Sequence, residues 1–271
     1  MKILVAGGTG LIGRQVVDIL TGQGHQAIAA SPSSGVDSVT GEGLDEAMAG
    51  TDVVIDLTNT TDFDENVVVP FFTKSTANLL AAEKRAGVQH HVVLSVVGTD
   101  RIGPVGYFAG KTVQENAVRD GGVPYTLVRA TQFFEFIPMI ADVGTRDGKV
   151  FLTPHLMQPM AAADVARLVA DAAVSPALNG ELEIAGPERA PMHEFASRVL
   201  SAQGDPRTVA VDPDAGTSVS PSRKQPLSRS EKPASARKLW TNGCRRTQTP
   251  STTGAPAAST ENPSPRQITD E

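Results

Sequence analysis

The sequence predicts an α/β fold in which a doubly wound parallel sheet is followed by a small C-terminal cap and a disordered tail. Apolar, β-branched runs alternate with longer segments of helical periodicity over residues 1–130, as expected for a parallel sheet covered by helices on both faces. Shorter segments follow up to residue 212. From residue 213 onward Ser, Thr, Pro and Ala dominate without an apolar period, which is typical of disorder.

The first part, residues 1–130, shows strand and helix patterns in alternation. Strands are expected at residues 3–6, 27–30, 36–39, 52–56, 91–95 and 124–128. Helices are expected at residues 14–20, 44–49, 67–86 and 107–120. This order implies parallel strands joined by crossover helices.

The second part, residues 131–212, is expected to form a cap over the carboxyl edge of the sheet, where ligands of open α/β sheets bind. Its expected helices are 133–141, 164–173 and 192–202, and its expected strands are 149–152, 157–160 and 181–185. The apolar segment from Phe133 to Phe136 has two interpretations: packing within the cap, or an apolar wall for a substrate.

Charge and composition argue against several classes of function. The 271-residue chain has a net charge of −6, although the segment from Gly216 onward carries nine Lys and Arg against four Asp and Glu. The remaining body is therefore acidic, unlike a nucleic-acid-binding protein. No apolar run approaches the roughly 20 residues of a membrane span, and the N-terminus predicts no secretory leader.

The single cysteine, Cys244, suits a reducing compartment. We therefore expect a cytoplasmic protein. From the acidic body and the lack of a membrane span, we expect a small-molecule substrate and no nucleic-acid or membrane partner. The oligomeric state is left open. No group of Cys, His and acidic residues has the spacing of a metal site. His90 and His91 are adjacent, so on a strand they should point to opposite faces and play structural roles.

A glycine-rich segment, residues 7–13, lies between the first expected strand and the first expected helix. In such a context the first glycine allows a tight turn, a later one lets the backbone approach a pyrophosphate, and the last lets the helix pack closely on the strand. The free N–H groups of the first helical turn and the helix dipole favour phosphate there. The motif predicts a Rossmann-like dinucleotide site formed by Gly7, Thr9, Gly10, Leu11, Ile12 and Gly13.

Tyr107 and Lys111 are four residues apart, so on the expected helix they share a face, and Ser95 stands at the end of the preceding strand. A tyrosine hydroxyl can exchange a proton with a carbonyl or hydroxyl group, and a nearby ammonium would lower its pKa. A serine can polarise the substrate oxygen. We predict Tyr107 as the acid or base, Lys111 as its tuner and ribose anchor, and Ser95 as the oxyanion partner of a hydride transfer.

Five segments together resemble atypical short-chain dehydrogenases/reductases of the NmrA-like group, over residues 1–212. These segments are residues 7–13, 92–98, 107–111, 128–134 and 184–188. The resemblance implies a Rossmann-like fold, NAD(P) binding and an oxidoreductase that acts on a small carbonyl, quinone or hydroxyl substrate. Members that lack the tyrosine act as dinucleotide sensors, and this chain keeps Tyr107. A non-catalytic NAD(P) sensor and a sugar-nucleotide epimerase are the alternatives.

The fold implied by the resemblance places further residues near the cofactor. Thr58 and Asn59 follow the strand beside it, near the ribose or adenine, and Ala130 and Thr131 are expected to border the nicotinamide. The second expected strand ends without an acidic residue, which would repel a 2′-phosphate. It is followed by Ser31 and Ser33, whose hydroxyls can bind a phosphate or a ribose, and not by an arginine. On balance NADP(H) is favoured over NAD(H).

The resemblance also bears on the tail, because relatives tend to end in a folded segment that contains Tyr-Phe-Gly and Glu-Trp-Leu. Residues 216–219 do not match, but permissible codons read one frame over can encode Tyr-Phe-Gly there. The same shift can encode Leu-Asp-Glu-Trp-Leu across residues 239–244. A shifted reading frame and a natural disordered linker are therefore the two hypotheses for residues 213–271.

Overall fold

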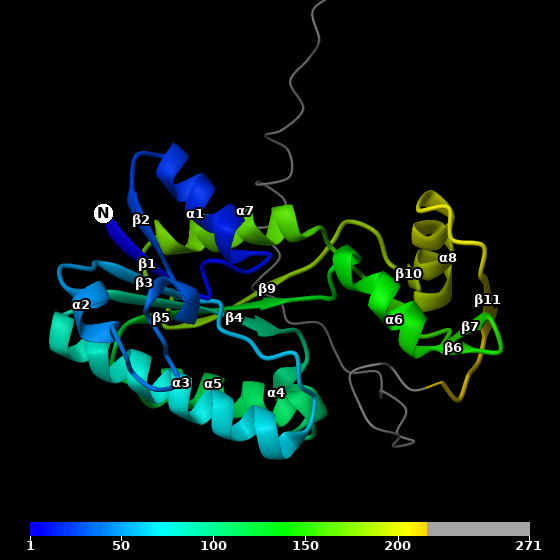
Figure 1. Ribbon diagram of the computed structural model, residues 1–271, viewed down its shortest axis with the longest axis horizontal. Helices are drawn as coiled ribbons and strands as arrows, with labels where there is room; N and C mark the ends of the chain where they lie inside the picture. The colour runs from blue at the N-terminus through cyan, green and yellow to red at the C-terminus, as the bar shows by residue number, and fades with distance from the viewer. Residues whose placement is uncertain (216–271) are drawn as a thin grey trace, which may run out of the picture. The chain divides into compact units, whose positions relative to one another are not determined.

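The computed structural model describes residues 1–215, and its centre is a six-stranded parallel sheet (Figure 1). The strands lie in the order β2-β1-β3-β4-β5-β9. Their bounds are β1 Lys2–Ala6, β2 Gln26–Ala30, β3 Val53–Asp56, β4 His90–Val96, β5 Tyr125–Ala130 and β9 Gly180–Ile184. The strand order reverses direction between β1 and β3, so the carboxyl ends of these two strands border the switch point where ligands of such sheets bind.

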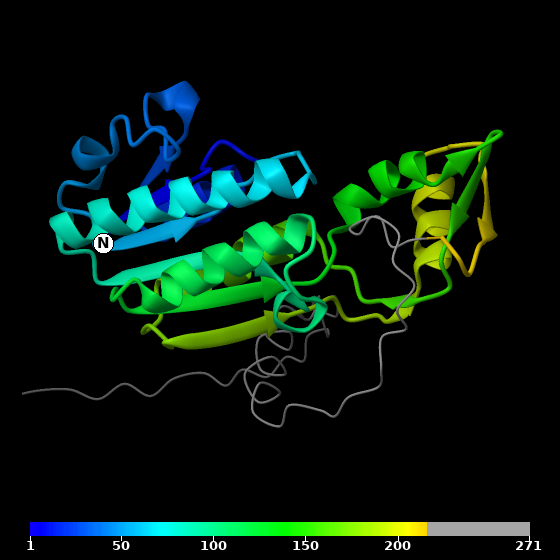
Figure 2. The same ribbon diagram turned by 90° about the horizontal axis from the view of Figure 1, so that it is seen from below.

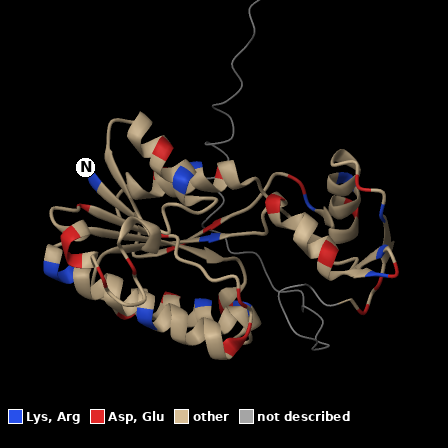
Figure 3. Cartoon of the chain, in the orientation of Figure 1, with Lys and Arg blue, Asp and Glu red and all other residues tan. Residues whose placement is uncertain are grey.

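Helices cover both faces of the sheet, as predicted (Figure 2). The helices α1 (Gly13–Gly22) and α7 (Ala162–Ala173) pack on one face with the inward side chains Ile3 and Val5 of β1. The opposite face carries α3 (Glu65–Ala86) and α5 (Tyr107–Asp120), and α3 packs there with Leu4 of β1. Ile3 and Leu4 belong to different core clusters because successive side chains of a strand point to opposite faces of the sheet. Charged residues lie mainly on the helices and loops (Figure 3).

Shorter elements join these layers. The helix α2 (Leu44–Met48) precedes β3, the helix α4 (Thr99–Ile102) precedes α5, and 3₁₀ turns occupy η1 (Pro32–Ser34) and η2 (Phe134–Phe136). The helix α5 has the bounds predicted from the sequence, and Gly87 ends α3 in the left-handed conformation expected of a C-terminal glycine. The helix α3 begins earlier than expected because Asp64 accepts a hydrogen bond from the amide of Asn66 and caps it.

A second apolar cluster holds the remaining elements together. The helices α6 (Ile137–Val143) and α8 (Met192–Ala202) pack through Ile140 and Phe195. A small sheet has the order β11-β7-β6, with β6 Thr145–Arg146, β7 Lys149–Leu152 and β11 Thr208–Val211. The strands β8 (Leu156–Met157) and β10 (Ala190–Pro191) pair antiparallel. These elements lie within residues 131–212, for which the sequence predicted a cap.

Two predicted cap elements belong to the main sheet instead. The strand β9 pairs in parallel with β5, and the apolar stripe of α7, including Val165 and Val169, packs in the cluster formed with α1. The expectation that all of residues 131–212 form the cap is therefore wrong for α7 and β9. The helix α7 has a buried apolar stripe like that of the cap helix α8, so periodicity alone could not reveal which sheet it covers.

The strand expected at residues 36–39 is also absent. Asp37 Oδ1 accepts hydrogen bonds from the amides of Val39 at 2.7 Å and Thr40 at 3.3 Å, and this side-chain turn replaces strand pairing. The two hypotheses for the tail fall on residues 216–271, outside the described residues. Within residues 1–215, no helix is long and apolar enough for a membrane span.

Candidate functional site

The glycine loop, residues 7–13, connects β1 to α1 and shows why glycine is required at several of its positions. Gly7 adopts a φ of +74°, and a Cβ there would lie 2.6 Å from the carbonyl oxygen of Leu57. A Cβ on Gly13 would lie 2.6 Å from the Cα of Gly8 and still closer to the carbonyl oxygen of Gly7. Both positions exclude a side chain because backbone atoms fill the space.

Gly10 differs from its neighbours. A Cβ there would meet only the carbonyl oxygen of Gly7, at 3.2 Å, a tight contact that a shift of a few tenths of an ångström relieves, so Gly10 is the least crowded glycine of the loop. The backbone amides of Thr9, Leu11 and Ile12 donate to no acceptor among residues 1–215. An uncrowded glycine beside free amides at the start of a ten-residue helix is the arrangement that a pyrophosphate needs. The loop therefore fits a dinucleotide.

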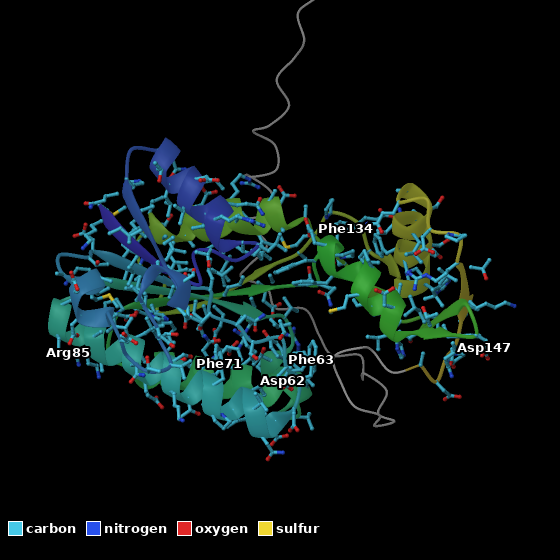
Figure 4. The ribbon with its side chains drawn as sticks, in the orientation of Figure 1. Asp62, Phe63, Phe71, Arg85, Phe134 and Asp147 are labelled. Carbon is cyan, nitrogen blue, oxygen red and sulfur yellow. The ribbon has the colours of Figure 1, made fainter. Side chains whose placement is uncertain are left out.

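A pocket of about 150 Å³ extends from this loop across the carboxyl ends of β1, β2 and β3. Its lining includes Ser31, Thr58 and Asn59, which the sequence predicted, together with Asp37 and Phe71, which it did not. Phe71 is labelled in Figure 4. The full lining is Ala6, Gly7, Ala30, Ser31, Pro32, Val36, Asp37, Ser38, Val39, Leu44, Thr58, Asn59 and Phe71. No Lys or Arg side chain belongs to this set.

Ser33 does not line the pocket. Its hydroxyl lies 2.8 Å from that of Ser31, so it contacts a lining residue rather than the space itself. Thr58 donates through both its amide and its hydroxyl to Asp56 Oδ1, at 2.9 and 2.6 Å. These two bonds fix the turn that follows β3 and place Asn59 on the pocket wall.

Tyr107, the first residue of α5, donates its hydroxyl to Asn59 Oδ1 at 2.8 Å. Its half-buried ring packs against Phe63 and Phe72, with centroid distances of 6.0 and 6.1 Å. Burial raises the pKa of the Tyr107 hydroxyl above its usual value of 10. The expected lowering by Lys111 is not present, because the lysine amine bonds elsewhere. The hydroxyl is therefore a proton donor in this structure.

Lys111 lies one helical turn beyond Tyr107 and is buried. Its Nζ donates to the carbonyl oxygen of Leu94 at 2.8 Å and to Gln114 Oε1. The ammonium also lies 4.6 Å from the centre of the Phe72 ring. Burial lowers the pKa of Lys111 to about 8, although the nearby carboxylate of Asp56 opposes this shift.

Ser95 is directed into a buried ion pair rather than toward Tyr107. Its hydroxyl donates to Glu115 Oε1 at 2.6 Å. Arg129 donates to both oxygens of the same carboxylate, at 3.0 and 2.7 Å. Burial would raise the pKa of Glu115, but these bonds, Arg129 foremost, lower it below its usual value. The hydrogen bonding of Ser95 therefore supports the Glu115 carboxylate, and its predicted role as oxyanion partner stays a prediction.

Ala130 and Thr131 lie at the end of β5 and do not line the pocket. Ala130 is buried, and Thr131 Oγ1 donates to the carbonyl oxygen of Gln158 at 2.7 Å. This bond ties the end of β5 to the segment after β8. The expectation that both residues border the nicotinamide stays a prediction.

The segment that follows β5 is engaged in packing. Phe134, shown next to α6 in Figure 4, packs its ring 5.7 Å from that of Phe195, and the rings of Phe133 and Phe136 stack at 5.6 Å. Glu135 accepts two hydrogen bonds from the amide of Ala162 at the start of α7, at 3.0 and 3.1 Å. These contacts favour the packing interpretation of the segment.

His90 and His91 point to opposite faces, as predicted. His90 Nε2 lies 2.9 Å from Thr126 Oγ1, whereas His91 Nδ1 lies 2.7 Å from Glu83 Oε1 on α3. Burial lowers the pKa of His90 to about 4. Burial would also lower the pKa of His91, but the Glu83 carboxylate raises it above its usual value. Both residues are bonded within the core.

Sequence reasoning missed three residues of this region. Gln114 was detectable, because it lies three residues after Lys111 and so shares its helical face. Asp56 ends β3 and is fully buried, and a carboxylate in an otherwise apolar strand is a signal that a partner exists. Asp37 gave no such signal, because its position on the pocket depends on the turn it forms.

The chain was then compared with known proteins. The profile of the NAD(P)H-binding family matches residues 7–176. A (4-alkanoyl-5-oxo-2,5-dihydrofuran-3-yl)methyl phosphate reductase of Streptomyces griseus is 32% identical over 225 residues, which cover 75% of this chain and 74% of that protein. An NAD(P)H azoreductase of Xenophilus azovorans is 28% identical over 229 residues, which cover 77% of each.

Among solved structures, a dTDP-4-dehydrorhamnose reductase of Clostridium acetobutylicum superposes with a TM-score of 0.66 at 20% identity, over 78% of this chain and 84% of that one. This likeness confirms the Rossmann-like fold. The family match spans the glycine loop, the pocket and the Tyr107–Lys111 pair, and so it agrees with the dinucleotide site derived above. The chain therefore belongs to the NAD(P)H-binding family.

Proposed function

We propose that this protein is an NAD(P)H-dependent oxidoreductase that transfers a hydride between the nicotinamide and a small carbonyl, quinone or hydroxyl substrate. One observation carries the proposal: Asn59 lines the pocket beside the glycine loop and also accepts the hydrogen bond of the Tyr107 hydroxyl. The Tyr107 hydroxyl therefore lies beside the pocket wall, which supports its proposed role as the proton donor. A reduction needs a proton for the substrate oxygen next to the hydride that the nicotinamide supplies.

The residues of the chain have separate tasks in this proposal. The glycine loop holds the pyrophosphate through backbone amides, and Ser31 and Thr58 border the adenosine end of the pocket. Tyr107 gives its proton to the substrate oxygen, and its raised pKa keeps the hydroxyl protonated until the substrate arrives. Lys111 binds the nicotinamide ribose through an N–H that the protein leaves unused. Its positive charge then stabilises the phenolate formed after proton transfer.

The names of the relatives support reductive chemistry. The Streptomyces griseus relative is named a (4-alkanoyl-5-oxo-2,5-dihydrofuran-3-yl)methyl phosphate reductase, and the Xenophilus azovorans relative an NAD(P)H azoreductase. These activities belong to the relatives. Their substrates differ from each other, so we keep the substrate class of this chain at small carbonyls, quinones and hydroxyls. The single cysteine of the sequence favours a cytoplasmic location, where reduced nucleotides are available.

For the nucleotide, we propose a preference for NADP(H) over NAD(H). The supporting features are the hydroxyl of Ser31 on the pocket wall and the lack of an acidic residue directly after β2. Asp37 also lines the pocket, but its Oδ1 is already bonded to two backbone amides, which offset part of its charge. Titrations with NADPH and NADH test the preference. Tighter binding of NADH would overturn it and would identify Asp37 as the ribose acceptor.

The substitution Tyr107→Phe tests the reaction. Turnover in a screen of quinones and aldehydes should fall by about 10²- to 10⁴-fold, because the proton donor is lost, while the affinity for nucleotide is retained. Tyr125→Phe is the matched control, since Tyr125 lies on β5 outside the pocket and should leave turnover unchanged. Equal turnover in Tyr107→Phe and wild type would contradict the assigned role. Wild-type protein that binds nucleotide but turns over no substrate would favour the non-catalytic sensor.

A further inference from the structure

A buried chain of side chains links β3 to α5 behind the Tyr107–Lys111 pair. Asp56 Oδ2 accepts a hydrogen bond from Gln114 Nε2 at 2.8 Å, and Gln114 Oε1 in turn accepts one from Lys111 Nζ. Asp56 and Gln114 are fully buried, and Lys111 is 2% exposed. Lys111 and Gln114 share a face of α5, whereas Asp56 lies 58 residues before Gln114, so only the fold brings the carboxylate to them.

The chain has a defined direction. An amide has a donor end and an acceptor end, and here the donor end meets a carboxylate while the acceptor end meets an ammonium. If the amide were turned over, its NH₂ group would face the Lys111 ammonium and its oxygen would face the Asp56 carboxylate, and neither pair could form a hydrogen bond. The other carboxylate oxygen, Asp56 Oδ1, is occupied by the amide and hydroxyl of Thr58. Gln114 is therefore held in one orientation by its two neighbours.

Lys111 keeps one donor free. An ammonium has three N–H donors, and within residues 1–215 two of them are used, by the carbonyl of Leu94 and by Gln114. Both acceptors belong to the buried interior and hold the ammonium in place, with the Phe72 ring 4.6 Å away. A buried, oriented ammonium with one open donor is suited to a ligand hydroxyl.

Charged groups around Lys111 single out Asp56 as its counter-charge. Glu115 on the same helix also favours the ammonium form, but its carboxylate is already paired with Arg129. The helix α3 contributes the Phe72 ring, and Tyr107 is neutral one turn earlier. Burial would lower the pKa of His91 on β4, but the carboxylates of Glu83 and, to a smaller extent, Asp56 raise it above its usual value. No other carboxylate among the described residues is bonded to Lys111 through a bridging side chain.

We propose that Gln114 and Asp56 are positioning residues for Lys111: Gln114 is the bridge that orients the ammonium, and Asp56 is the buried charge that keeps it protonated. The inference rests on the proposed function, in which Lys111 binds the nicotinamide ribose and supports Tyr107. A network that served stability alone would affect unfolding but would leave the pH dependence of nucleotide binding unchanged. The test therefore follows the protonation of Lys111 itself.

The first experiment replaces the counter-charge and keeps its shape, with Asp56→Asn in the full-length protein. NMR of protein labelled with ¹³C at lysine Cε reports the Lys111 titration, assigned by the signal missing in Lys111→Met. The Lys111 titration midpoint should fall by about one pH unit. The dissociation constant for NADPH should rise about tenfold near pH ~8.5 and less than about twofold near pH ~6, where Lys111 is charged in both proteins.

The second experiment breaks the bridge with Gln114→Met, which has similar length but no hydrogen-bonding amide. Nucleotide binding should weaken at both pH values, because orientation is lost even when the ammonium is charged. Asp171→Asn and Gln89→Met are the matched controls, since both residues are exposed and lie outside the network. Thermal unfolding of each variant checks that the fold is retained.

An unchanged Lys111 titration in Asp56→Asn, together with unchanged nucleotide binding in Gln114→Met, would overturn the proposal. If Asp56→Asn does not fold, the result with Gln114→Met alone decides the role of the bridge. A failure of the proposed function gives a different result. If wild-type protein binds neither NADPH nor NADH, the proposed function is wrong, but the Lys111 titration in Asp56→Asn still reports whether Asp56 keeps the ammonium protonated.

Discussion

The glycine loop and the Tyr107–Lys111 pair border the same switch point, but they are built in different ways. The loop works through backbone atoms of seven consecutive residues, although the end of β2 and the residue after β3, Leu57, also pack against its first glycines. The pair works through side chains whose partners come from elsewhere: Asn59 after β3, Leu94 on β4, and Gln114 with Asp56 behind it. A site made of backbone can be recognised from a short motif, whereas a site made of side chains needs the whole fold.

This difference explains which predictions failed. The sequence predicted the glycine loop and a reason for Gly7, Gly10 and Gly13, and the structure leaves no space for a side chain at Gly7 or Gly13. It also predicted that Lys111 would lower the pKa of Tyr107, but the buried partners of Lys111 hold its amine and burial raises that pKa instead. Spacing on a helix reports which residues share a face and does not report what they bond.

The largest effect is expected where a buried charge loses its partner. Replacing Arg129→Met removes the bidentate cation of the buried Glu115 carboxylate, which keeps only Arg119, at 2.8 Å, and the Ser95 hydroxyl as side-chain partners. We expect a loss of about 3 kcal/mol in the free energy of unfolding, the lower end for a broken buried pair. Urea unfolding measures this change. Arg198→Met is the control, because its ion pair with Glu188 is exposed and its removal should change stability little. If both substitutions lower the free energy of unfolding equally, the buried Arg129–Glu115 pair contributes no more to stability than the exposed Arg198–Glu188 pair.

The second largest effect is expected in the glycine loop, which is built from backbone atoms. Gly13→Ala forces a Cβ to 2.6 Å from the Cα of Gly8 and still closer to the carbonyl oxygen of Gly7, distances that only a displacement of the loop backbone relieves. We expect a loss of about 1–3 kcal/mol in the free energy of unfolding, together with weakened nucleotide binding. Gly22→Ala on the same helix is the control, because nothing lies within 4 Å of its added methyl group, and it should be neutral or stabilising. Similar losses in both variants would contradict close packing as the cause.

A third prediction separates the needs of the ligand from those of the fold. Gly10→Ala adds a methyl group that the protein can accommodate with a slight shift, so thermal unfolding should change little. The same methyl group occupies the approach to the pyrophosphate, and the dissociation constant for NADPH should rise by roughly tenfold or more. Calorimetric titration measures it. Unchanged affinity would mean that the nucleotide does not approach the loop at this residue.

The smallest effects concern how the stability of the fold depends on pH. His90 and His91, on opposite faces of β4, should act on it in opposite directions. The pKa of His90 is lowered to about 4, so as pH falls below 6.5 the unfolded chain takes up a proton that the folded protein does not, and stability decreases. The pKa of His91 is raised above 6.5, so its contribution is present below that pH and is lost as pH rises through the folded value.

Thermal unfolding measured across pH tests both signs. Glu83→Gln removes the carboxylate that raises the pKa of His91, and it should flatten the decline of stability above about pH 6.5. His90→Gln should instead flatten the decline on the acidic side. A Glu83→Gln profile that keeps the full alkaline decline would exclude His91 as its source.

The sequence by itself determined the local features of this protein. The bounds of α5, the left-handed Gly87 at the end of α3 and the opposite faces of His90 and His91 depend on neighbours within a few residues. The glycine loop is recognisable from its own seven residues, although Leu57 and the end of β2 pack against it. For such features, backbone sterics and the periods of helix and strand are sufficient causes.

Only the tertiary structure decided which segments meet. The pairing of β9 with β5, the packing of α7 beside α1 and the absence of a strand after η1 depend on competition among several apolar segments and on one side-chain turn at Asp37. The partners of Ser95 and Lys111 likewise come from distant parts of the chain. A buried polar group takes whichever complementary group the fold places within hydrogen-bond distance, because leaving it without a partner costs free energy.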